Sequence, residues 1–401
     1  MLQVESQCPQ FLLPPSLSTL AYCSNSGGAH DKTTSGSARK MKISALRMRC
    51  FYGTVLVLFY LLISCLARCE KKLVEVHRII AVGDVHGDAD NFLKILRIAN
   101  LIEDDATEAA DVLDNPPRWK YSSSRRNGTA VRTTLVQLGD LIDRGEEDLQ
   151  VLNIAISLQE QTAQSGSQDE VVLLIGNHEL LNIQGYYHYV NTNNYGGFLS
   201  KALRAEGMKA EGAFGKYIVD NFKAAHVDEG ILFVHAGIET SMNVKDIEAL
   251  NMDVREALRQ GMSRHPFLGS SGPLWTRKMI IQSMGDECSD VEAALKQLNA
   301  THIVVGHTPQ ESGHIGQYCD GQVFAIDVGM SRWMYNKVAA LELLFFKYAD
   351  DITDTSTASF VVRELREGDS GFCHSCVEER SGLDATRGGD SAEESDGFDD
   401  L

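Results

Sequence analysis

The sequence predicts an α/β fold whose strands end at one shared site, and two observations lead to this prediction. Short apolar, β-branched runs alternate along the chain with stretches of helical pattern, which is typical of α/β proteins. Five of the runs also stop at a residue that can bind a metal, and ligands of open α/β sheets collect where strands end. We therefore expect the residues that end the five runs to lie together in one site. The runs are 79–83, 135–139, 171–176, 231–234 and 303–306.

Two N-terminal segments precede the first run. Residues 1–40 are polar, rich in Ser and Gly and without periodicity, which predicts a disordered leader. Residues 41–69 are first basic and then apolar over residues 51–67, with small residues at the end, which predicts a signal peptide or a signal anchor. A signal anchor would make residues 51–67 a membrane tether. We expect the secretory pathway or endomembranes, or alternatively a plastid reached through a signal-bearing leader.

The globular domain is expected over residues 74–346, and its first strand ends at Asp84. His86 lies two places further on, so both side chains can point at one ion from a tight turn, and the glycines beside them let the backbone approach closely. A helix is expected over residues 90–102. Residues 104–130, rich in Asp, Pro, Ser and Arg, predict an inserted surface loop.

The second run ends at Asp140, whose two carboxylate oxygens can bridge two cations. Arg144 follows four places later, and its planar guanidinium suits phosphate oxygens. A helix is expected over residues 148–161. The third run ends at Asn177, which can give its amide oxygen to a metal. His178 is too close in sequence to be the obvious ligand of the same ion, so an acid or base role suits it better.

A long segment, residues 182–223, follows the third run and is rich in Tyr, Asn and Gly. Its length predicts a lid or an accessory subdomain. The tyrosines at positions 186, 187 and 189 allow two interpretations: an aromatic pocket for phosphotyrosine, or ordinary packing.

The fourth and fifth runs end at His235 and His307. A single histidine on an apolar strand is more often a core residue than a ligand, but five such stops in one chain are improbable by coincidence. Carboxylate, imidazole and amide ligands together suit Mn, Fe or Zn better than Ca²⁺. One shared aspartate would leave two half-filled ligand shells, with positions for a bridging water and a substrate oxygen.

The motifs resemble those of the calcineurin-like metallophosphoesterases, phosphoprotein phosphatase branch. They are Gly-Asp-x-His-Gly, Gly-Asp-x-x-Asp-Arg-Gly, Gly-Asn-His-Glu, His-Ala-Gly and Gly-His-Thr. The stretches 176–190 and 326–331 resemble the bacterial-like subgroup called Shewanella-like phosphatases. The resemblance implies a central β-sandwich of mixed sheets flanked by helices, with a dinuclear metal site at the carboxyl ends of the strands.

The resemblance also implies a role for each motif residue. His178 would donate a proton to the leaving group, oriented by Asp143, while Arg144, Asn177 and Arg277 would bind the phosphate. Arg277 matches a Trp-x-Arg pattern of bacterial-like members. The implied ligands of the first metal are Asp84, His86 and Asp140, and those of the second are Asp140, Asn177, His235 and His307.

The function implied is hydrolysis of phosphoproteins, in which a metal-bridging hydroxide attacks phosphorus directly and in line. Two alternatives stay open: hydrolysis of diadenosine polyphosphates or related nucleotides, and a non-catalytic scaffold on the same fold. A lost ligand would favour the scaffold, and none appears lost. The net charge of −18 argues against nucleic acid as a partner. The oligomeric state is left open.

The cysteines and the C-terminal end complete the sequence-based predictions. Cys288 and Cys319 could form a disulfide in an oxidising compartment or remain two buried thiols. Cys373 and Cys376 form a lone Cys-x-x-Cys, which is weak evidence for a metal or redox site. Residues 366–401 predict an acidic disordered tail. Asn127 and Asn299 begin glycosylation sequons, which matter only in a secretory protein.

Overall fold

The structure is a computed structural model that describes residues 73–103, 107–122, 129–262, 264–348 and 360–368. Several predictions lie outside these residues: the disordered leader, the signal peptide or anchor, the sequon at Asn127, the Cys-x-x-Cys motif and nearly all of the acidic tail. Within the described part of the chain, no helix has the length and apolar character needed to cross a membrane.

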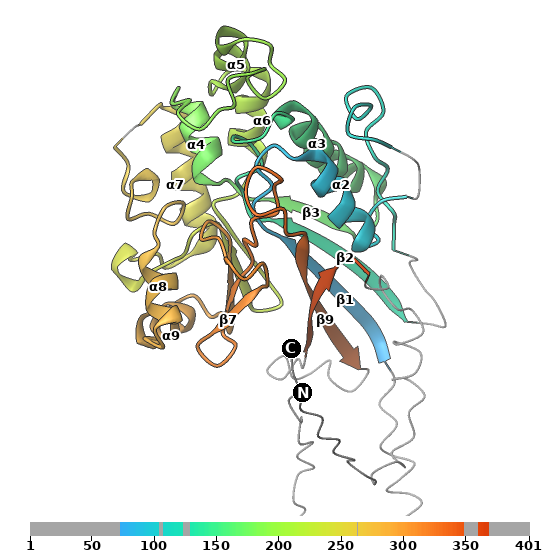
Figure 1. Cartoon of the computed structure of the whole chain (residues 1–401). Coiled ribbons are helices and arrows are strands. Elements are labelled where there is room, and N and C mark those ends of the chain that lie inside the picture. The colour runs from blue at the N-terminus through green and yellow to red at the C-terminus, as the bar shows by residue number, and fades with distance from the viewer. Residues whose placement is uncertain (1–72, 104–106, 123–128, 263, 349–359, 369–401) are drawn as a thin grey trace, which may run out of the picture. The chain divides into compact units, whose positions relative to one another are not determined.

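Two five-stranded sheets form the centre of the fold (Figure 1). The first has the order β10-β9-β1-β2-β3, and the second has the order β4-β5-β6-β8-β7. Each sheet contains three neighbouring parallel strands, β1-β2-β3 in the first and β5-β6-β8 in the second. The strands of the first sheet are β1 (Leu73–Val82), β2 (Ala130–Gln137), β3 (Glu170–Leu173), β9 (Ala339–Tyr348) and β10 (Phe360–Arg366). Those of the second are β4 (Ala225–Asp228), β5 (Ile231–Val234), β6 (His302–Val305), β7 (Gly316–Tyr318) and β8 (Val323–Ala325).

The sheets pack face to face through one apolar layer. Ile79 of β1 and Val136 of β2 belong to the same buried cluster as Phe233 of β5 and Val304 of β6. The opposite face of the first sheet is covered by helices, so its parallel strands are buried on both sides. This is why they read in the sequence as nearly continuous apolar runs. The predicted sandwich of mixed sheets is confirmed.

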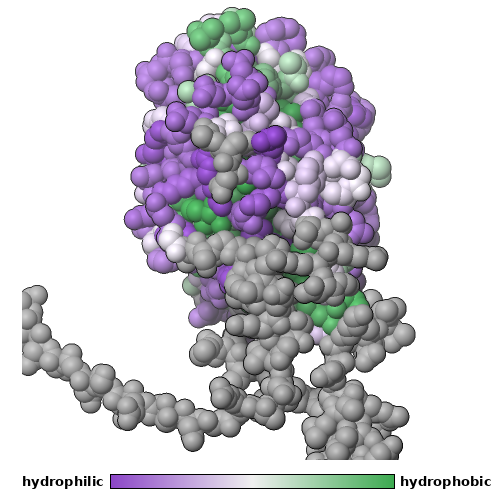
Figure 2. Space-filling view, turned by 90° about the vertical axis from the view of Figure 1, so that its right-hand side faces the viewer, coloured by the Kyte–Doolittle hydropathy of each residue, from purple (hydrophilic) through white to green (hydrophobic). Residues whose placement is uncertain are grey.

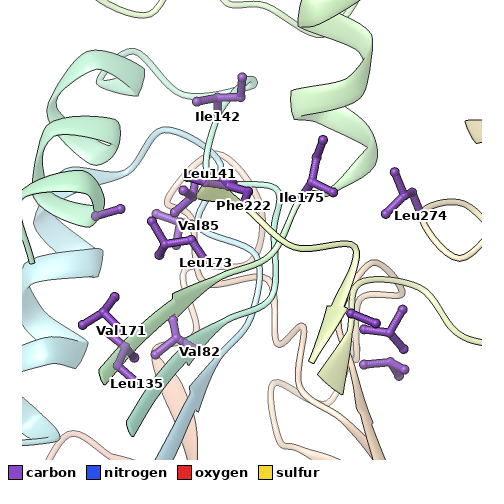
Figure 3. Packing of buried hydrophobic residues seen from close by; sticks show 14 of the residues in the cluster. Val82, Val85, Leu135, Leu141, Ile142, Val171, Leu173, Ile175, Phe222 and Leu274 are labelled. Carbon is purple, nitrogen blue, oxygen red and sulfur yellow. The ribbon is translucent and has the colours of Figure 1, made fainter. Parts of the chain in front are cut away.

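Helices cover the outer faces of the sandwich, with α2 and α3 over the first sheet in Figure 1. Their apolar side chains join those of the sheet in one cluster, part of which Figure 3 shows around Val82, Leu135 and Leu173. The face on the side of α2 and α3 is mostly hydrophilic (Figure 2). The helices are α2 (Ala89–Ile98), α3 (Asp148–Ser165), α4 (Asn177–Ile183), α5 (Lys201–Met208), α6 (Ala213–Asn221), α7 (Ile247–Arg259), α8 (Lys278–Met284) and α9 (Ser289–Gln297). Two 3₁₀ turns lie at Thr240–Met242 and Pro266–Leu268.

The bounds of the first two predicted helices shift slightly. α2 ends at Ile98, four residues before the predicted end at Ile102. Asn100 adopts a left-handed conformation (φ 54°), and the Leu101 N–H donates to the Leu96 carbonyl, which is a common way for a helix to stop. α3 continues to Ser165, where the left-handed Gly166 (φ 68°) ends it.

The inserted loop at 104–130 is not purely a surface feature, so that prediction is wrong in part. Val112 and Trp119 are buried, and the Trp119 indole Nε1 donates to Asp169 over 3.1 Å. The two apolar side chains pack in the core and hold the loop beside α3. The sequence does not indicate this role, because the residues around them are mostly turn-forming Asp, Pro and Ser.

The first sheet continues past the predicted domain end at residue 346. β10 pairs antiparallel with β9, which places Arg366, the predicted first residue of the tail, in the sheet. The consecutive charged residues Arg363 and Glu364 hid this edge strand in the sequence. Arg363 of β10 pairs with the buried Glu342 of β9, which also pairs with Arg78 of β1 over 2.6 Å.

Cys288 and Cys319 form a disulfide, which decides between the two alternatives left open by the sequence. The bond joins the start of α9 to the turn between β7 and β8. Asn299, the first residue of the second sequon, is exposed beside this region.

Candidate metal centre

The six predicted metal ligands lie together at the carboxyl ends of parallel strands. The loop after β1 carries Asp84 and His86, the end of β2 leads to Asp140, and α4 begins at Asn177 after β3. From the second sheet, β5 leads to His235 and β6 leads to His307. All six are buried, with at most 6% of the residue surface exposed. The two sheets therefore supply ligands from opposite sides of one site.

Asp140 lies at the middle of the site. Its Oδ2 is 3.9 Å from His86 Nε2 and 3.4 Å from His235 Nε2. Its Oδ1 accepts from the His178 backbone N–H over 2.9 Å. Two triads can each hold a cation through ligand atoms within 4.8 Å of one another. They are His86, Asp140 and His178, and Asp140, His235 and His307. Asp140 is common to both triads, as a bridging ligand requires.

Asp84 and Asn177 complete the two sides. Asp84 Oδ2 is 3.8 Å from His86 Nε2, and both of its oxygens accept from the His307 backbone N–H, at 3.1 and 3.2 Å. Asn177 Oδ1 is 3.0 Å from His235 Nε2. Each of the six predicted ligands thus lies beside another of the six. The residues predicted for the first ion and those predicted for the second share Asp140.

Backbone carbonyls orient the three imidazoles that were predicted to be ligands. His86 Nδ1 lies 3.2 Å from the Ile142 carbonyl, and His235 Nδ1 lies 2.8 Å from the Leu138 carbonyl. His307 uses its other nitrogen, with Nε2 3.1 Å from the Trp275 carbonyl. When one ring nitrogen donates to a carbonyl, the other is left to bind a metal. No sequence signal marks these carbonyls.

Burial and close contact shift the pKa values of the Asp and His residues in the site. Burial raises the pKa of Asp84 well above its usual value, and the neighbouring Asp327 carboxylate raises it further. Burial lowers the pKa of His235, but Asp140 and Asp84 outweigh burial and raise it to about 10. Burial, with a nearby second histidine in each case, lowers the pKa of His86 and His307 to about 3. The neutral imidazoles of His86 and His307 beside crowded carboxylates fit bound cations.

His178 and Asp143 form a buried pair beside the ligands. His178 Nδ1 is 2.8 Å from Asp143 Oδ2, and His178 Nε2 faces the site, 3.8 Å from Asp140 Oδ2. Burial lowers the pKa of His178, but Asp140 and Asp143 reverse the effect and raise it overall. The arrangement can hold a proton on Nε2, directed toward the position between the two triads.

Two arginines flank the site differently. The Arg144 Nε is buried, and within the described residues it has no hydrogen-bond partner. The Arg144 guanidinium lies 5.2 Å from the centre of the Tyr189 ring, and that ring lies 4.9 Å from the His178 ring. Arg277 is exposed and donates to the Thr308 hydroxyl over 3.3 Å. A buried donor without an acceptor suits an incoming anion.

The backbone around the site is strained. Five non-glycine residues of the site have left-handed φ angles between 49° and 72°: His86, Asp140, Asp143, Arg144 and His307. Such conformations cost about 1–3 kcal/mol each and persist only where the surrounding fold imposes them. Buried apolar residues beside them, including Leu141 and Ile142 (Figure 3), hold these loops in place.

The structure adds a residue that the sequence analysis missed. Arg204 comes from α5, within the segment 182–223, and is fully buried. Its guanidinium donates to Asp143 Oδ1 and to Asp148 Oδ2, each over 2.6 Å, and to Asn182 Oδ1 over 2.8 Å. An isolated arginine in a helix gives no sequence signal of this role. The predicted lid or accessory subdomain is thus tied directly to the His178 pair.

Of the tyrosines in the same segment, Tyr189 reaches the site. Tyr186 instead stacks on His188, with ring centres 6.2 Å apart, and Tyr187 lies 5.8 Å from the Lys201 ammonium. Tyr189 is about half exposed (46%), and its ring lies against both His178 and Arg144.

Comparisons with known proteins agree with this geometry. A sequence model of the family "Calcineurin-like phosphoesterase" matches residues 77–311. The chain is 29% identical over 265 residues to Shewanella-like protein phosphatase 1 of Plasmodium berghei, covering 63% of this chain and 67% of that protein. It is 26% identical over 312 residues to Shewanella-like protein phosphatase 2 of Arabidopsis thaliana, covering 66% and 74%. The crystal structure of a cold-active protein-tyrosine phosphatase from a psychrophilic Shewanella species shares the fold, with a TM-score of 0.53 and 20% identity over 74% of this chain and 84% of that one.

Proposed function

The chain belongs to the calcineurin-like phosphoesterase family, and on that basis we propose that it is a metal-dependent phosphoprotein phosphatase. The observation that carries the proposal is the position of Asp140, which lies between His86 and His235, 3.9 and 3.4 Å from their Nε2 atoms, and next to the His178–Asp143 pair. A site that binds two cations around one carboxylate and keeps an acid beside them suits the hydrolysis of phosphate esters.

Six residues would hold the cations. Two bound metal ions would supply Lewis-acid chemistry, offsetting phosphoryl charge and making a water molecule more acidic. We assign Asp84, His86 and Asp140 to the first ion. Asp140, Asn177, His235 and His307 are assigned to the second. The mixed donor set favours Mn, Fe or Zn over Ca²⁺.

The chain's own groups would bind and orient the substrate. Arg144 offers its unpartnered Nε to a phosphate oxygen, and Arg277 offers a second guanidinium from the exposed side. The Asn177 side chain lies at the same edge and can contact the phosphate as well as a metal.

His178 would hold the proton for the leaving oxygen. Asp143 accepts from His178 Nδ1. Although burial lowers the pKa of His178, the carboxylates of Asp140 and Asp143 raise it overall, which favours the imidazolium. In that form the second nitrogen, which faces the site, carries a proton that can be donated. Arg204 and Asn182 fix Asp143 in turn by donating to its oxygens. General acid assistance of this kind is typically worth about 10²–10⁴-fold in rate.

The protein substrate is proposed from the relatives, since two of them are named protein phosphatases. Phosphopeptides carrying pSer, pThr or pTyr should be assayed beside diadenosine tetraphosphate, with the full chain reloaded with Mn²⁺. Faster turnover of a phosphopeptide is expected. Turnover of the dinucleotide alone would favour the nucleotide hydrolase, and two bound cations without any turnover would favour a scaffold.

We also propose that the chain enters the secretory pathway or endomembranes, with residues 41–69 as a signal peptide or a signal anchor. The Cys288–Cys319 bond supports this proposal, because disulfides persist in oxidising compartments. In an anchored form, residues 51–67 would be the membrane tether. Expression of the chain with a C-terminal fluorescent tag tests the proposal, and a uniformly cytosolic signal would contradict it.

A further inference from the structure

A sixth parallel strand also ends at the metal centre. β8 runs parallel to β6, and the backbone N–H of Ile326, the next residue after β8, donates to the Val305 carbonyl over 2.8 Å. The residue that follows is Asp327. The parallel strands β1, β2 and β3 lead to Asp84, Asp140 and Asn177. On the other sheet β5, β6 and β8 lead to His235, His307 and Asp327, so Asp327 occupies the one strand end to which no role has been given.

Asp327 lies directly beside the loop that carries Asp84. A Cβ atom added to Gly83 would be 2.6 Å from the Ile326 carbonyl oxygen and 3.2 Å from Asp327 Cα. Only glycine permits this approach.

One oxygen of Asp327 has a structural partner and the other does not. Oδ1 accepts from the Gly329 backbone N–H over 2.9 Å, in the turn after β8. Oδ2 is buried, and within the described residues it has no hydrogen-bond partner. The residue is 2% exposed. Leaving such an oxygen unpaired is costly, more so for a charged group, unless something absent from the protein chain satisfies it.

Three buried carboxylates therefore gather at this end of the strands: Asp84, Asp140 and Asp327. Asp84 Oδ2 is 3.8 Å from His86 Nε2 and Asp140 Oδ2 is 3.4 Å from His235 Nε2, whereas Asp327 Oδ2 has no hydrogen-bond partner among the described residues. Buried carboxylates are normally paired or bind metals. Because Asp327 borders Asp84, a cation held by Asp84 and Asp140 is the group best placed to balance all three.

We propose that Asp327 is a further residue of the metal centre, whose free Oδ2 stabilises the cation held by Asp84, His86 and Asp140. The inference rests on the metal centre of the proposed function. The alternative is a purely structural residue that fixes the Gly329 turn through Oδ1. Asp327→Asn separates the two, because asparagine keeps an oxygen for Gly329 and removes the charge and the free carboxylate oxygen.

The test is a metal titration of the full chain. Wild-type protein, Asp327→Asn and the control Asp169→Asn are stripped of metal and titrated with Mn²⁺ in a chelator buffer, with bound manganese measured by mass spectrometry. Asp169 is a suitable control because it is buried but bonds Trp119, Ser122 and Thr133 instead of the site. For Asp327→Asn we expect one of two Mn²⁺ sites to weaken by about 10–100-fold, while the control keeps both affinities.

Thermal unfolding of the same proteins, with and without Mn²⁺, gives a second readout. Removing one of three crowded carboxylates should leave the metal-free Tm unchanged or raised, and should reduce the increase in Tm that Mn²⁺ produces. A purely structural role, which asparagine preserves through its bond to Gly329, would instead leave the increase in Tm produced by Mn²⁺ as large as in the wild type and the control. Unchanged Mn²⁺ affinities in Asp327→Asn would overturn the inference. Two well-bound Mn²⁺ ions in a wild type that hydrolyses no phosphopeptide would refute the proposed function but not this inference.

Discussion

Substitution of Arg204 tests whether the segment 182–223 supports the site. Arg204→Met keeps most of the side-chain volume but removes every donor of a fully buried guanidinium. Asp143 and Asp148 each lose a hydrogen bond of 2.6 Å that the guanidinium donates to them. The Asn182 side-chain oxygen loses a third, of 2.8 Å. Removing one partner from a buried ion pair leaves uncompensated charge inside the protein. The cost is typically about 3–5 kcal/mol.

Much of this loss of stability is expected to come from the Asp148 carboxylate. A double-mutant cycle of Arg204 and Asp148 can therefore measure it. Burial raises the pKa of Asp148 to about 6 although Arg204 acts to lower it, so without Arg204 the buried carboxylate would lose its cationic partner and keep the Asp143 backbone N–H. Asp148→Asn has nearly the same shape and removes that charge. Adding it to Arg204→Met should therefore restore at least about 1 kcal/mol, within the range measured for residues in contact.

The assay is urea denaturation of the metal-free wild type, both single variants and the double variant. Turnover of a phosphopeptide is measured in parallel, and Arg204→Met should lower kcat because Asp143 no longer orients His178. Arg255→Met serves as a control, since Arg255 donates to the Val219 carbonyl and not to the site. A cost below about 1 kcal/mol for Arg204→Met, together with additive effects in the cycle, would refute the reasoning.

Three other changes have definite expected outcomes. His178→Asn should lower kcat by about 10²–10⁴-fold and leave the metal content unchanged, because the loss is that of a general acid; a variant that loses its metals would contradict the assigned role. Asp140→Asn should abolish metal retention and activity together, since both triads share this carboxylate, and full activity would exclude bridging. Cys288→Ser combined with Cys319→Ser should lower the free energy of unfolding by about 3–4 kcal/mol, as expected for a separation of 31 residues. Turnover at low temperature should persist in this variant, and an unchanged denaturation midpoint would argue against the disulfide.

The sequence was sufficient to predict five of the six parallel strands that lead to the site. Their apolar runs are short but nearly continuous, and each stops at a residue with metal-binding chemistry, so strand pattern and side-chain type agree. β10 was missed because an edge strand needs only one apolar face, and Arg363 and Glu364 interrupt its apolar residues. The buried Trp119 was missed for a related reason: one aromatic anchor among turn-forming residues leaves no periodic signal.

The convergence of the six proposed ligands was predictable because each lies in a short local motif. Residues that act across long sequence separations were not predictable. Arg204 is 61 residues from Asp143 in the chain, and its role depends on how α5 packs against the loop after β2. The carbonyls of Leu138 and Trp275 orient His235 and His307 through the backbone, which any residue type could supply. Asp327 lay within a recognised motif, but its free oxygen becomes apparent only in the folded protein.

The most direct test of the central claim is a crystal structure of the full chain soaked in Mn²⁺, with anomalous diffraction measured at the manganese edge. Two peaks about 3.5–4 Å apart are expected, one on each side of Asp140. Asp84 and His86 should contact one ion, while Asn177, His235 and His307 contact the other. Peaks elsewhere, or a single ion that does not touch Asp140, would contradict the account.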